Sequence, residues 1–318
     1  MLNTPMDVLE QFPVRKTGEQ KRAFRAAVQG YARELGYEYR EEKGSFGCRN
    51  VVLGDPEGAE YLVTAHYDTC AALPFPNLIT PCALLPFLGY QMLLCLWMLL
   101  MPLIPALAVG YLAGNADLGL AVWYVLFWVE LIMMLFGPAN RSNANDNTSG
   151  VVTVLEIART LPQLHRDKVC FVLFDLEEAG LIGSASYSKA HKKQTGNQLV
   201  LNLDCVGDGD TIMLFPTKKL RKDEKRMSKL RTLRGSFGEK RLDIREKGFA
   251  VYPSDQGNFP YGVGICALRK GPVGLYLGRI HTKRDTILEQ TNVNLLRSAL
   301  TSLITRAEKT NRSTLSKE

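Results

Sequence analysis

The stretch EYLVTAHYDT, residues 60–69, decides the fold. Its segment YLVTA is a continuous apolar run of strand length, which is typical of a strand that is buried on both faces of a sheet. Two polar residues, His66 and Asp68, end the run, and their spacing of two places both side chains on the same side of an extended chain. We therefore predict a central strand with a polar site at its carboxyl end.

Strands and helices alternate on both sides of this stretch. We predict helices at 7–35, 151–161, 181–191 and 293–308, and strands at 37–41, 49–53, 169–174, 199–203, 212–215, 265–268 and 273–277. This alternation predicts an α/β fold with a mixed, largely parallel sheet flanked by helices. In such a fold, ligands gather beyond the carboxyl ends of the strands.

The region after the HYDT motif differs in composition from the rest of the chain. The 318 residues include 39 basic and 32 acidic ones, yet only Asp117 and Glu130 are charged in residues 69–140. Two apolar runs, 78–114 and 118–136, are joined by the polar turn GNAD. About 20 residues cross a bilayer as a helix, so the second run fits one span. The first run is longer and contains prolines, so we expect it to bend or to lie partly in the interface.

These runs predict a transmembrane hairpin, residues 78–138, inserted into one discontinuous domain formed by 1–77 and 139–318. Motifs on both sides must meet in one site, so the chain crosses the bilayer an even number of times. The first twenty residues contain no apolar signal-peptide core, and Arg141 follows the second run. We therefore expect an integral protein of the cell membrane with both soluble parts in the cytoplasm. Glu130 is costly in hydrocarbon, which makes it a functional or helix-contact residue, or a neutral carboxyl hydrogen-bonded to the first helix.

The net charge of +7 is local. Residues 216–250 hold thirteen Lys or Arg against five Asp or Glu. We expect a solvated helix and loop on the surface of the domain, with contact to anionic lipid headgroups as the alternative. Nucleic-acid binding is not expected, since no aromatic residues are interleaved for base stacking. The seven scattered cysteines form no CxxC pair and predict free thiols.

Five motifs that supply metal-binding side chains follow predicted strands or lie in loops. They are AHYDT (65–69), NANDNTSG (143–150), FDLEEAG (174–180), NLDCVG (202–207) and IHTKRDT (280–286). Their acids and imidazoles are His66, Asp68, Asp146, Glu177, Glu178, Asp204 and His281. Oxygen and nitrogen ligands of this kind suit zinc, and crowded carboxylates repel one another unless cations lie between them. Each motif alone has a simpler explanation, such as a helix N-cap turn for NDNTSG, but their joint occurrence predicts a metal site.

The four patterns AHxD, NDNxSG, EExG and HTxxD, in this order, resemble those of peptidase family M28, the zinc-dependent aminopeptidases. The resemblance covers roughly residues 20–310 without the apolar block, and it implies an α/β/α sandwich that holds two zinc ions. By this resemblance, the first ion is held by His66 and Asp204, the second by Glu178 and His281, and both by Asp146; Glu177 is the general base, and Asp68 orients His66. Family members often have Ser-Asp-His before the last strands, whereas this chain has Gln256 in SDQGNF. Glutamine does not titrate near neutral pH, so we expect a difference in substrate contacts or in support of the ligands.

The combined features predict a membrane-anchored di-zinc aminopeptidase that hydrolyses the N-terminal bond of peptides with a free N-terminus. No cofactor beyond the two zinc ions is expected. Because the hairpin is inserted after the HYDT motif, we expect the site to lie near the bilayer and to favour hydrophobic or membrane-associated peptides. Three alternatives remain: another amide hydrolase, such as a deacylase of lipid-linked substrates; a glutaminyl-cyclase-like acyltransferase, against which His66 argues; and a non-catalytic receptor or scaffold.

Overall fold

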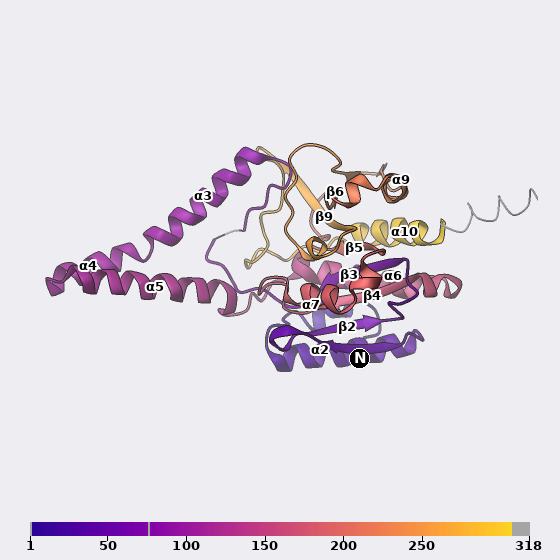
Figure 1. Cartoon of the computed structure of the whole chain (residues 1–318), viewed down its shortest axis with the longest axis horizontal. Coiled ribbons are helices and arrows are strands. Elements are labelled where there is room, and N and C mark those ends of the chain that lie inside the picture. Colours follow the sequence, from indigo (N-terminus) through magenta and orange to yellow (C-terminus); the bar gives the residue numbers. More distant parts are fainter. Residues whose placement is uncertain (1, 76, 307–318) are drawn as a thin grey trace, which may run out of the picture.

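The computed structural model describes residues 2–75 and 77–306 of the chain. Within these residues one ten-stranded sheet has the order β1-β2-β4-β3-β5-β9-β6-β8-β7, with β10 paired to β9 (Figure 1). The strands are β1 Tyr39–Lys43, β2 Arg49–Leu53, β3 Tyr61–His66, β4 Val169–Phe174, β5 Leu199–Leu203, β6 Thr211–Pro216, β7 Gly235–Phe237, β8 Lys240–Ile244, β9 Gly262–Gly271 and β10 Gly274–Tyr276. Residues 1, 76 and 307–318, including the predicted end of the last helix, lie outside the described residues.

The centre of the sheet is parallel and its flanks are mixed. Strands β4, β3, β5 and β9 run in the same direction, and β6 and β8 are parallel to each other. The pairs β1–β2, β2–β4, β6–β9, β7–β8 and β9–β10 are antiparallel. The predicted mixed α/β sheet flanked by helices is therefore confirmed, and β3, which carries the HYDT motif at its end, lies between β4 and β5.

Alternating side chains of the central strands pack into two different cores. Tyr61, Val63 and Ala65 of β3 belong to the larger core, and Leu62 belongs to the smaller one. The larger core is completed by α2 (Gly18–Glu34), α6 (Gly150–Thr160), α9 (Glu224–Arg231) and α10 (Gln290–Arg306). On the other face α7 (Ile182–Ala190), which precedes the short helix α8 (Lys192–Thr195), contributes Tyr187. Because both faces are covered, β3 is buried along its whole length.

The single helix predicted near the N-terminus is wrong. Two helices, α1 (Asp7–Gln11) and α2, are separated by residues 12–17. Pro13 lacks an N–H and disfavours helix in the residue before it, so the first helix ends there. Thr17 then starts α2 with a capping box, in which its side chain accepts a hydrogen bond from the Gln20 N–H and the Gln20 side chain accepts one from the Thr17 N–H.

The prediction that the basic segment, residues 216–250, forms only a helix and a loop is wrong in part. The segment contains α9 and two strands, β7 and β8, at the edge of the sheet. Strand β7 is short and has the sequence Gly-Ser-Phe, and β8 has three charged residues among its five, so neither shows a clear apolar alternation. Many basic side chains of the segment pair with acids of the same segment: Arg231 lies 2.8 Å from Glu246, and Arg234 lies 2.8 Å from Asp243.

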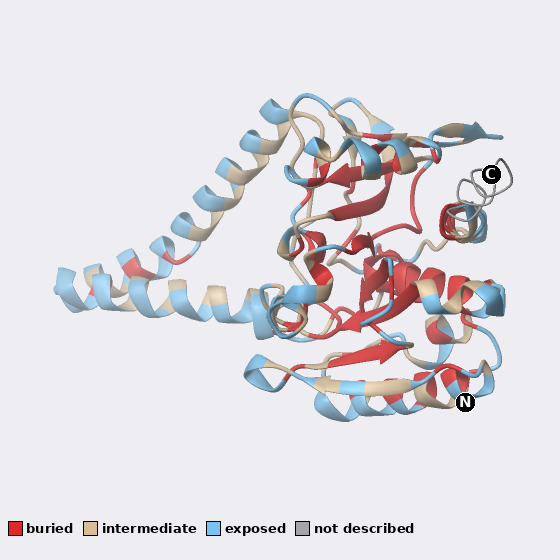
Figure 2. Ribbon diagram, turned by 45° about the vertical axis from the view of Figure 1, so that its right-hand side comes forward, coloured by how far each residue is buried: buried red, intermediate tan, exposed pale blue. Residues whose placement is uncertain are grey.

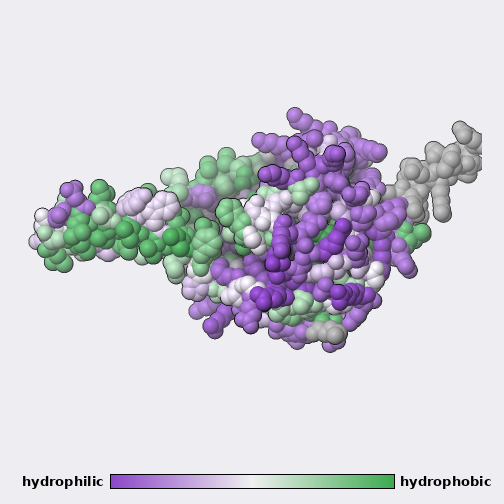
Figure 3. Space-filling view, turned by 60° about the horizontal axis from the view of Figure 1, so that its bottom comes forward, coloured by the Kyte–Doolittle hydropathy of each residue, from purple (hydrophilic) through white to green (hydrophobic). Residues whose placement is uncertain are grey.

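Three apolar helices project from the body of the molecule (Figure 1). They are α3 (Leu84–Leu100), α4 (Leu103–Ala113) and α5 (Ala116–Phe136). The first apolar run is broken before Pro102, as expected from its prolines. The stretches 84–113 and 116–136 are long and apolar enough to cross a membrane by length and composition, with mean hydropathies of 2.4 and 2.1. They are largely exposed (Figure 2), and their surface is apolar (Figure 3).

The projecting hairpin joins the body beside β3. We call residues 70–75 and 137–140 the neck. In the neck, Ala71 and Ala139 form an antiparallel bridge, so the chain leaves and re-enters the body at adjacent positions. Closer to α3, Ile79 and Leu277 exchange two backbone hydrogen bonds of 3.0 and 2.9 Å. The base of the hairpin is thereby fixed to the loop that follows β10.

Candidate metal centre

The predicted site residues converge at the carboxyl edge of the parallel strands. This edge is where the loops after β4, β3 and β5 meet, because the three strands are neighbours that run in the same direction. The residues are His66 at the end of β3, Glu177 and Glu178 after β4, Asp204 after β5, Asp146 before α6, and His281 after β10. The fold therefore brings together side chains from five segments of the sequence.

The carboxylate of Asp146 lies between the two histidines. Its Oδ1 is 3.2 Å from His66 Nε2, and its Oδ2 is 3.0 Å from His281 Nε2. Asp204 Oδ1 lies 3.7 Å from His66 Nε2, and Glu178 Oε2 lies 3.4 Å from His281 Nε2. Each histidine thus faces one oxygen of Asp146 and one further acid. This arrangement offers two adjacent sets of nitrogen and oxygen donors that share one carboxylate.

The chemistry of these donors fits metal cations. Burial raises the pKa of Glu178 to about 8, and the negative charge of Asp146 adds to this against the effect of His281. Burial also raises the pKa of Glu177 well above its ordinary value. Among the described residues, Glu178 Oε1 and Asp204 Oδ1 are buried without a hydrogen-bond partner. Crowded and desolvated carboxylates whose oxygens accept no hydrogen bond are stabilised by cations placed between them, and the donor types are those of zinc.

Asp68 contacts the glutamate pair as well as His66. Its Oδ1 accepts a hydrogen bond of 3.0 Å from the Glu177 N–H, and its Oδ2 accepts one of 3.2 Å from the Glu178 N–H. Its distance to His66 Nδ1 is 3.5 Å, and that nitrogen makes no hydrogen bond to any described residue. Asp68 therefore holds the turn that carries the two glutamates, and it neighbours His66 as an ion-pair partner rather than as a hydrogen-bond acceptor.

Asp285 supports the Asp146 turn and was not among the predicted site residues. Its Oδ1 accepts from the Asn145 N–H at 2.8 Å, and its Oδ2 accepts from the Asp146 N–H at 3.0 Å. The Asn147 side chain also fixes this turn, by accepting from the Gly150 N–H at 3.0 Å. Asp285 is the acid of the HTxxD pattern, so the motif could have identified it as a site residue. Its function as a backbone acceptor becomes visible only in the folded chain.

Arg15 is a second residue that the sequence did not reveal. It lies in the gap between α1 and α2 and is fully buried. Its Nε donates to the Tyr67 carbonyl at 2.5 Å, and its Nη1 donates to Thr148 Oγ1 at 3.1 Å. Burial lowers the pKa of Arg15 to about 10, while the negative charges of Asp68 and Asp146 oppose this change. Arg15 is thus a buried cation that links the end of β3 to the turn before α6.

Gln256, at the point where the sequence departs from the family pattern, lies in the interior. Its Nε2 donates to the Tyr252 carbonyl at 2.6 Å, and its Oε1 accepts from Asn202 Nδ2 at 3.2 Å. Gly264 packs against it so closely that a Cβ would lie 2.7 Å from its Cδ. Gln256 therefore joins β5 and β9 to the loop before β9. The neighbouring Asp255 is fully buried, and burial raises its pKa to about 7.

Comparison with known sequences identifies the class of protein as a peptidase. The sequence model described as peptidase family M28 matches residues 133–303, more than half of the chain. The chain therefore belongs to peptidase family M28. The matched range includes the motifs from Asp146 to His281 and leaves out β3, so the positions of His66 and Asp68 in the site are known from the fold.

Individual relatives agree with this assignment. Aminopeptidase YwaD of Bacillus subtilis (strain 168) is 42% identical over 67 residues, which make up 20% of this chain and 15% of that protein. A Zn-dependent exopeptidase from Parabacteroides distasonis has a similar structure, with a TM-score of 0.59 and 15% identity over 92% of this chain and 93% of that one. A glutaminyl cyclase from Porphyromonas gingivalis has a TM-score of 0.58 and 17% identity over 96% and 97% of the two chains. At these identities the structures show the shared fold.

Proposed function

We propose that the protein is a membrane-anchored aminopeptidase that uses two zinc ions to remove the N-terminal residue of peptides. The observation that carries the proposal is the Asp146 carboxylate, whose two oxygens face two histidines that each face a further acid. The relatives add support, since one is named an aminopeptidase and another a Zn-dependent exopeptidase. His66 and Asp204 would hold one ion, Glu178 and His281 the other, and Asp146 both. Bound zinc supplies Lewis-acid polarisation of a carbonyl and lowers the pKa of a water molecule.

Glu177 is the general base in this proposal. One oxygen of its carboxylate lies within 4.8 Å of ligand atoms of His66 and Asp204, and its N–H is held by Asp68. Glu177 accepts a proton from the attacking water and returns it to the leaving amine, so its own protonation state is the same before and after the reaction. Proton transfer by a positioned group of this kind contributes roughly 10²–10⁴-fold to a rate.

The test combines metal analysis with a peptide panel. The full chain is purified in detergent, and its metal content and kcat are compared with those of Glu177→Gln and of the exposed control Glu57→Gln. We expect two zinc ions in all three proteins and a kcat lower by roughly 10²–10⁴-fold only in Glu177→Gln. Full activity of Glu177→Gln would remove the assigned base, and absence of zinc from the parent would overturn the proposal.

The same panel separates the alternative reactions. A peptide that begins with glutamine releases free glutamine if the protein is an aminopeptidase, whereas a cyclase converts it to a pyroglutamyl peptide. Peptides with an acetylated N-terminus are cleaved by a deacylase and resist an aminopeptidase. A parent protein with bound zinc and no turnover of any substrate would favour a receptor or scaffold.

We also propose that the hairpin spans the bilayer and that the body faces the cytoplasm. The exposed apolar helices support the first part, and two basic residues near the neck support the second. Lys16 Nζ donates to the Leu135 carbonyl at 3.2 Å, at the body end of α5, and Arg141 is exposed just after the neck. In intact cells we expect Asn115→Cys, in the distal turn, to react with a membrane-impermeant maleimide, and Lys225→Cys, in the body, to react only after lysis. The reverse pattern would contradict the orientation.

An apolar cavity of about 560 Å³ between the neck and the second half of α3 supports a preference for hydrophobic peptides. It is lined by residues of α3, including Trp97, by Phe75 of the neck, and by Gly278. Gly278 precedes the site residue His281 by three residues, a separation of at most about 10 Å along the chain. We propose that an apolar side chain of the substrate occupies this cavity.

Two matched aromatic substitutions test the cavity. Trp97→Ala should lower kcat/KM for hydrophobic peptides by roughly 10–160-fold relative to polar ones, because an apolar contact of about 1.5–3 kcal/mol is lost. Tyr111→Ala removes an exposed aromatic side chain elsewhere in the hairpin and should leave the ratio unchanged. If the ratio of kcat/KM for hydrophobic peptides to kcat/KM for polar peptides is the same in both variants, the cavity does not bind the substrate.

A further inference from the structure

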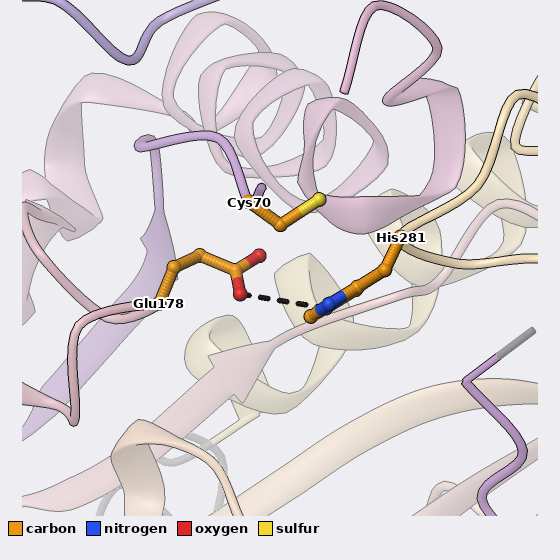
Figure 4. Close-up of side chains that lie close together, drawn as sticks. All are labelled: Cys70, Glu178 and His281. Atoms are coloured by element: carbon orange, nitrogen blue, oxygen red, sulfur yellow. Dashed lines mark ion pairs between the residues drawn. The ribbon is translucent and has the colours of Figure 1, made fainter. Parts of the chain in front are cut away.

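The thiol of Cys70 lies at the donor set of Glu178 and His281. One ligand atom from each of these three residues lies within 4.8 Å of the other two. Figure 4 shows the Glu178 carboxylate and the His281 ring pointing toward each other, with the Cys70 side chain beside the gap between them. Cys70 is 1% exposed and is a free cysteine of the neck. A buried thiol therefore adjoins the position that we assign to the second zinc ion.

Three separate segments produce this juxtaposition. Cys70 follows β3, Glu178 follows β4, and His281 follows β10, so the fold must assemble the group. Cys205 also lies near acids of the site, within 4.8 Å of ligand atoms of Asp146 and Asp204. Its nearness to Asp204 follows from chain adjacency, and its group contains no histidine. The geometry thus favours Cys70 as a ligand over Cys205.

Glu178 gives an independent indication that a ligand belongs in this group. Its side chain is nine-tenths buried, and its Oε1 has no hydrogen-bond partner among the described residues. Cys70 Sγ has one weak contact, to Asn143 Oδ1 at 3.7 Å, so the sulfur is not engaged by a strong hydrogen bond. A buried carboxylate oxygen without a partner beside an imidazole and a thiol is the donor combination of a zinc site.

We propose that Cys70 binds, as a thiolate, the metal ion held by Glu178 and His281. This inference rests on the proposed zinc function and adds a ligand to it. On binding, the S–H bond is replaced by a sulfur–metal bond, and the proton is released to solvent. With the shared Asp146, this position has four protein ligands, which is the number in a closed tetrahedral zinc site.

The two metal positions are then unequal. The His66 position has His66, Asp204 and the shared Asp146, and three protein ligands are typical of a catalytic zinc with an open position. Glu177 shares a donor group with His66 and Asp204, so the base stands beside the open position. Cys70 also belongs to the neck, where its carbonyl accepts from the Asn140 N–H at 3.1 Å. The closed metal position thus adjoins the neck of the hairpin, and the open metal position lies beside the general base Glu177.

The test uses spectroscopy rather than activity. The full chain in detergent is stripped with a chelator and reloaded with Co²⁺, and the near-ultraviolet sulfur-to-cobalt charge-transfer band is recorded. The same is done for Cys70→Ser, Cys205→Ser and Cys48→Ser, the last being a buried cysteine outside the metal-binding groups. X-ray absorption of the zinc-loaded parent measures sulfur scattering near 2.3 Å without any substitution.

We expect the band and the sulfur scattering in the parent, loss of the band in Cys70→Ser, and retention of the band in both other variants. Cys70→Ser should also bind one of its two ions more weakly by more than about tenfold. Two bound ions without sulfur scattering in the parent, or a band that persists in Cys70→Ser, would overturn the assignment of Cys70. Loss of the band in Cys205→Ser alone would also overturn it. Failure of the parent to bind any zinc or cobalt would instead overturn the proposed function.

Discussion

The body and the hairpin distribute polar and apolar side chains in opposite ways. In the body, acids such as Asp146 and Asp204 are buried, at 4% and 6% exposure. In the hairpin, large apolar side chains such as Tyr111 and Leu112 are exposed, at 88% and 82%. Figure 2 and Figure 3 show the same contrast as an exposed, apolar projection on a polar body with a buried interior.

The contrast teaches that the two regions need different surroundings. Clustered carboxylates of the body repel one another unless cations share them. Exposed apolar surface of the hairpin is unfavourable in water, by about 25 cal/mol per Å², and is favourable in hydrocarbon. One of the two acids of the hairpin, Glu130, has both carboxylate oxygens buried, and within the described chain neither oxygen has a hydrogen-bond partner. The alternative that Glu130 is hydrogen-bonded to the first helix is therefore wrong. Matched substitutions in the body and in the hairpin test the contrast between them.

The largest effect is expected from removing the shared acid of the body, with removal of an acid of the hairpin as the matched control. Asp146→Ala takes away the carboxylate that both donor sets share, so we expect loss of both zinc ions and a fall in kcat/KM of about 10⁴-fold or more. Glu130→Leu should keep both ions and full activity, because Glu130 belongs to no metal-binding group among the described residues and does not line the apolar cavity. Elemental analysis and peptide hydrolysis measure the two quantities. Retention of two ions by Asp146→Ala would contradict the assignment of Asp146 as the ligand that both ions share.

A buried cation in the body should matter for stability. Arg15→Met leaves the Tyr67 carbonyl without its donor and leaves Asp68 and Asp146 without a compensating charge. Removing one member of such a buried charged group costs about 3–5 kcal/mol. Urea unfolding of the full chain in detergent should therefore show this loss, whereas Arg22→Met, on the exposed face of α2, should change stability by less than about 0.5 kcal/mol. Equal stabilities would mean that Arg15 is dispensable.

Arg15 also shows which parts of the molecule the sequence could predict. The apolar run before His66 and the acids that follow other strands are local patterns, so the mixed sheet and a cluster of these side chains at one edge were predictable. The hydrogen bonds of Arg15 join residues 52 and 133 positions apart, and no local pattern encodes them. The hydrogen bonds that Asp285 accepts likewise span 139 and 140 positions.

Two misjudged elements have local causes. The helix predicted near the N-terminus was drawn across Pro13, although proline and the Thr17 capping box both mark a boundary. Strands β7 and β8 were missed because β7 has only three residues, Gly-Ser-Phe, and β8 has three charged residues among its five, so neither has the apolar composition of a buried strand. The break of the apolar run before Pro102 was predictable, since proline disrupts the hydrogen bonds of a helix.

A charge placed on the hairpin tests its apolar surroundings. Val125 is 58% exposed and lies near the middle of α5. Val125→Lys should make membrane insertion of α5 less favourable by about 2.5–3.5 kcal/mol, and Val125→Leu should leave it nearly unchanged. Glycosylation sites on either side of α5 report the ratio of inserted to translocated chains. Equal ratios for the two variants would indicate that this face of α5 does not contact lipid.

The smallest effect is expected where the two regions meet. Phe249 contacts Phe87 of α3, with ring centroids 5.8 Å apart, so Lys247 lies near the base of the hairpin. Lys225 is also exposed in the basic segment but lies on α9, away from the hairpin (Figure 1). Nanodiscs with anionic lipid should raise the Tm of the parent, and Lys247→Gln should lose about 1 kcal/mol of this stabilisation, or about 2–4 °C. Lys225→Gln should retain it, and high salt should abolish the difference. An equal loss in both variants would mean that the whole basic segment contacts lipid, and no loss in either would mean that the segment is a solvated surface.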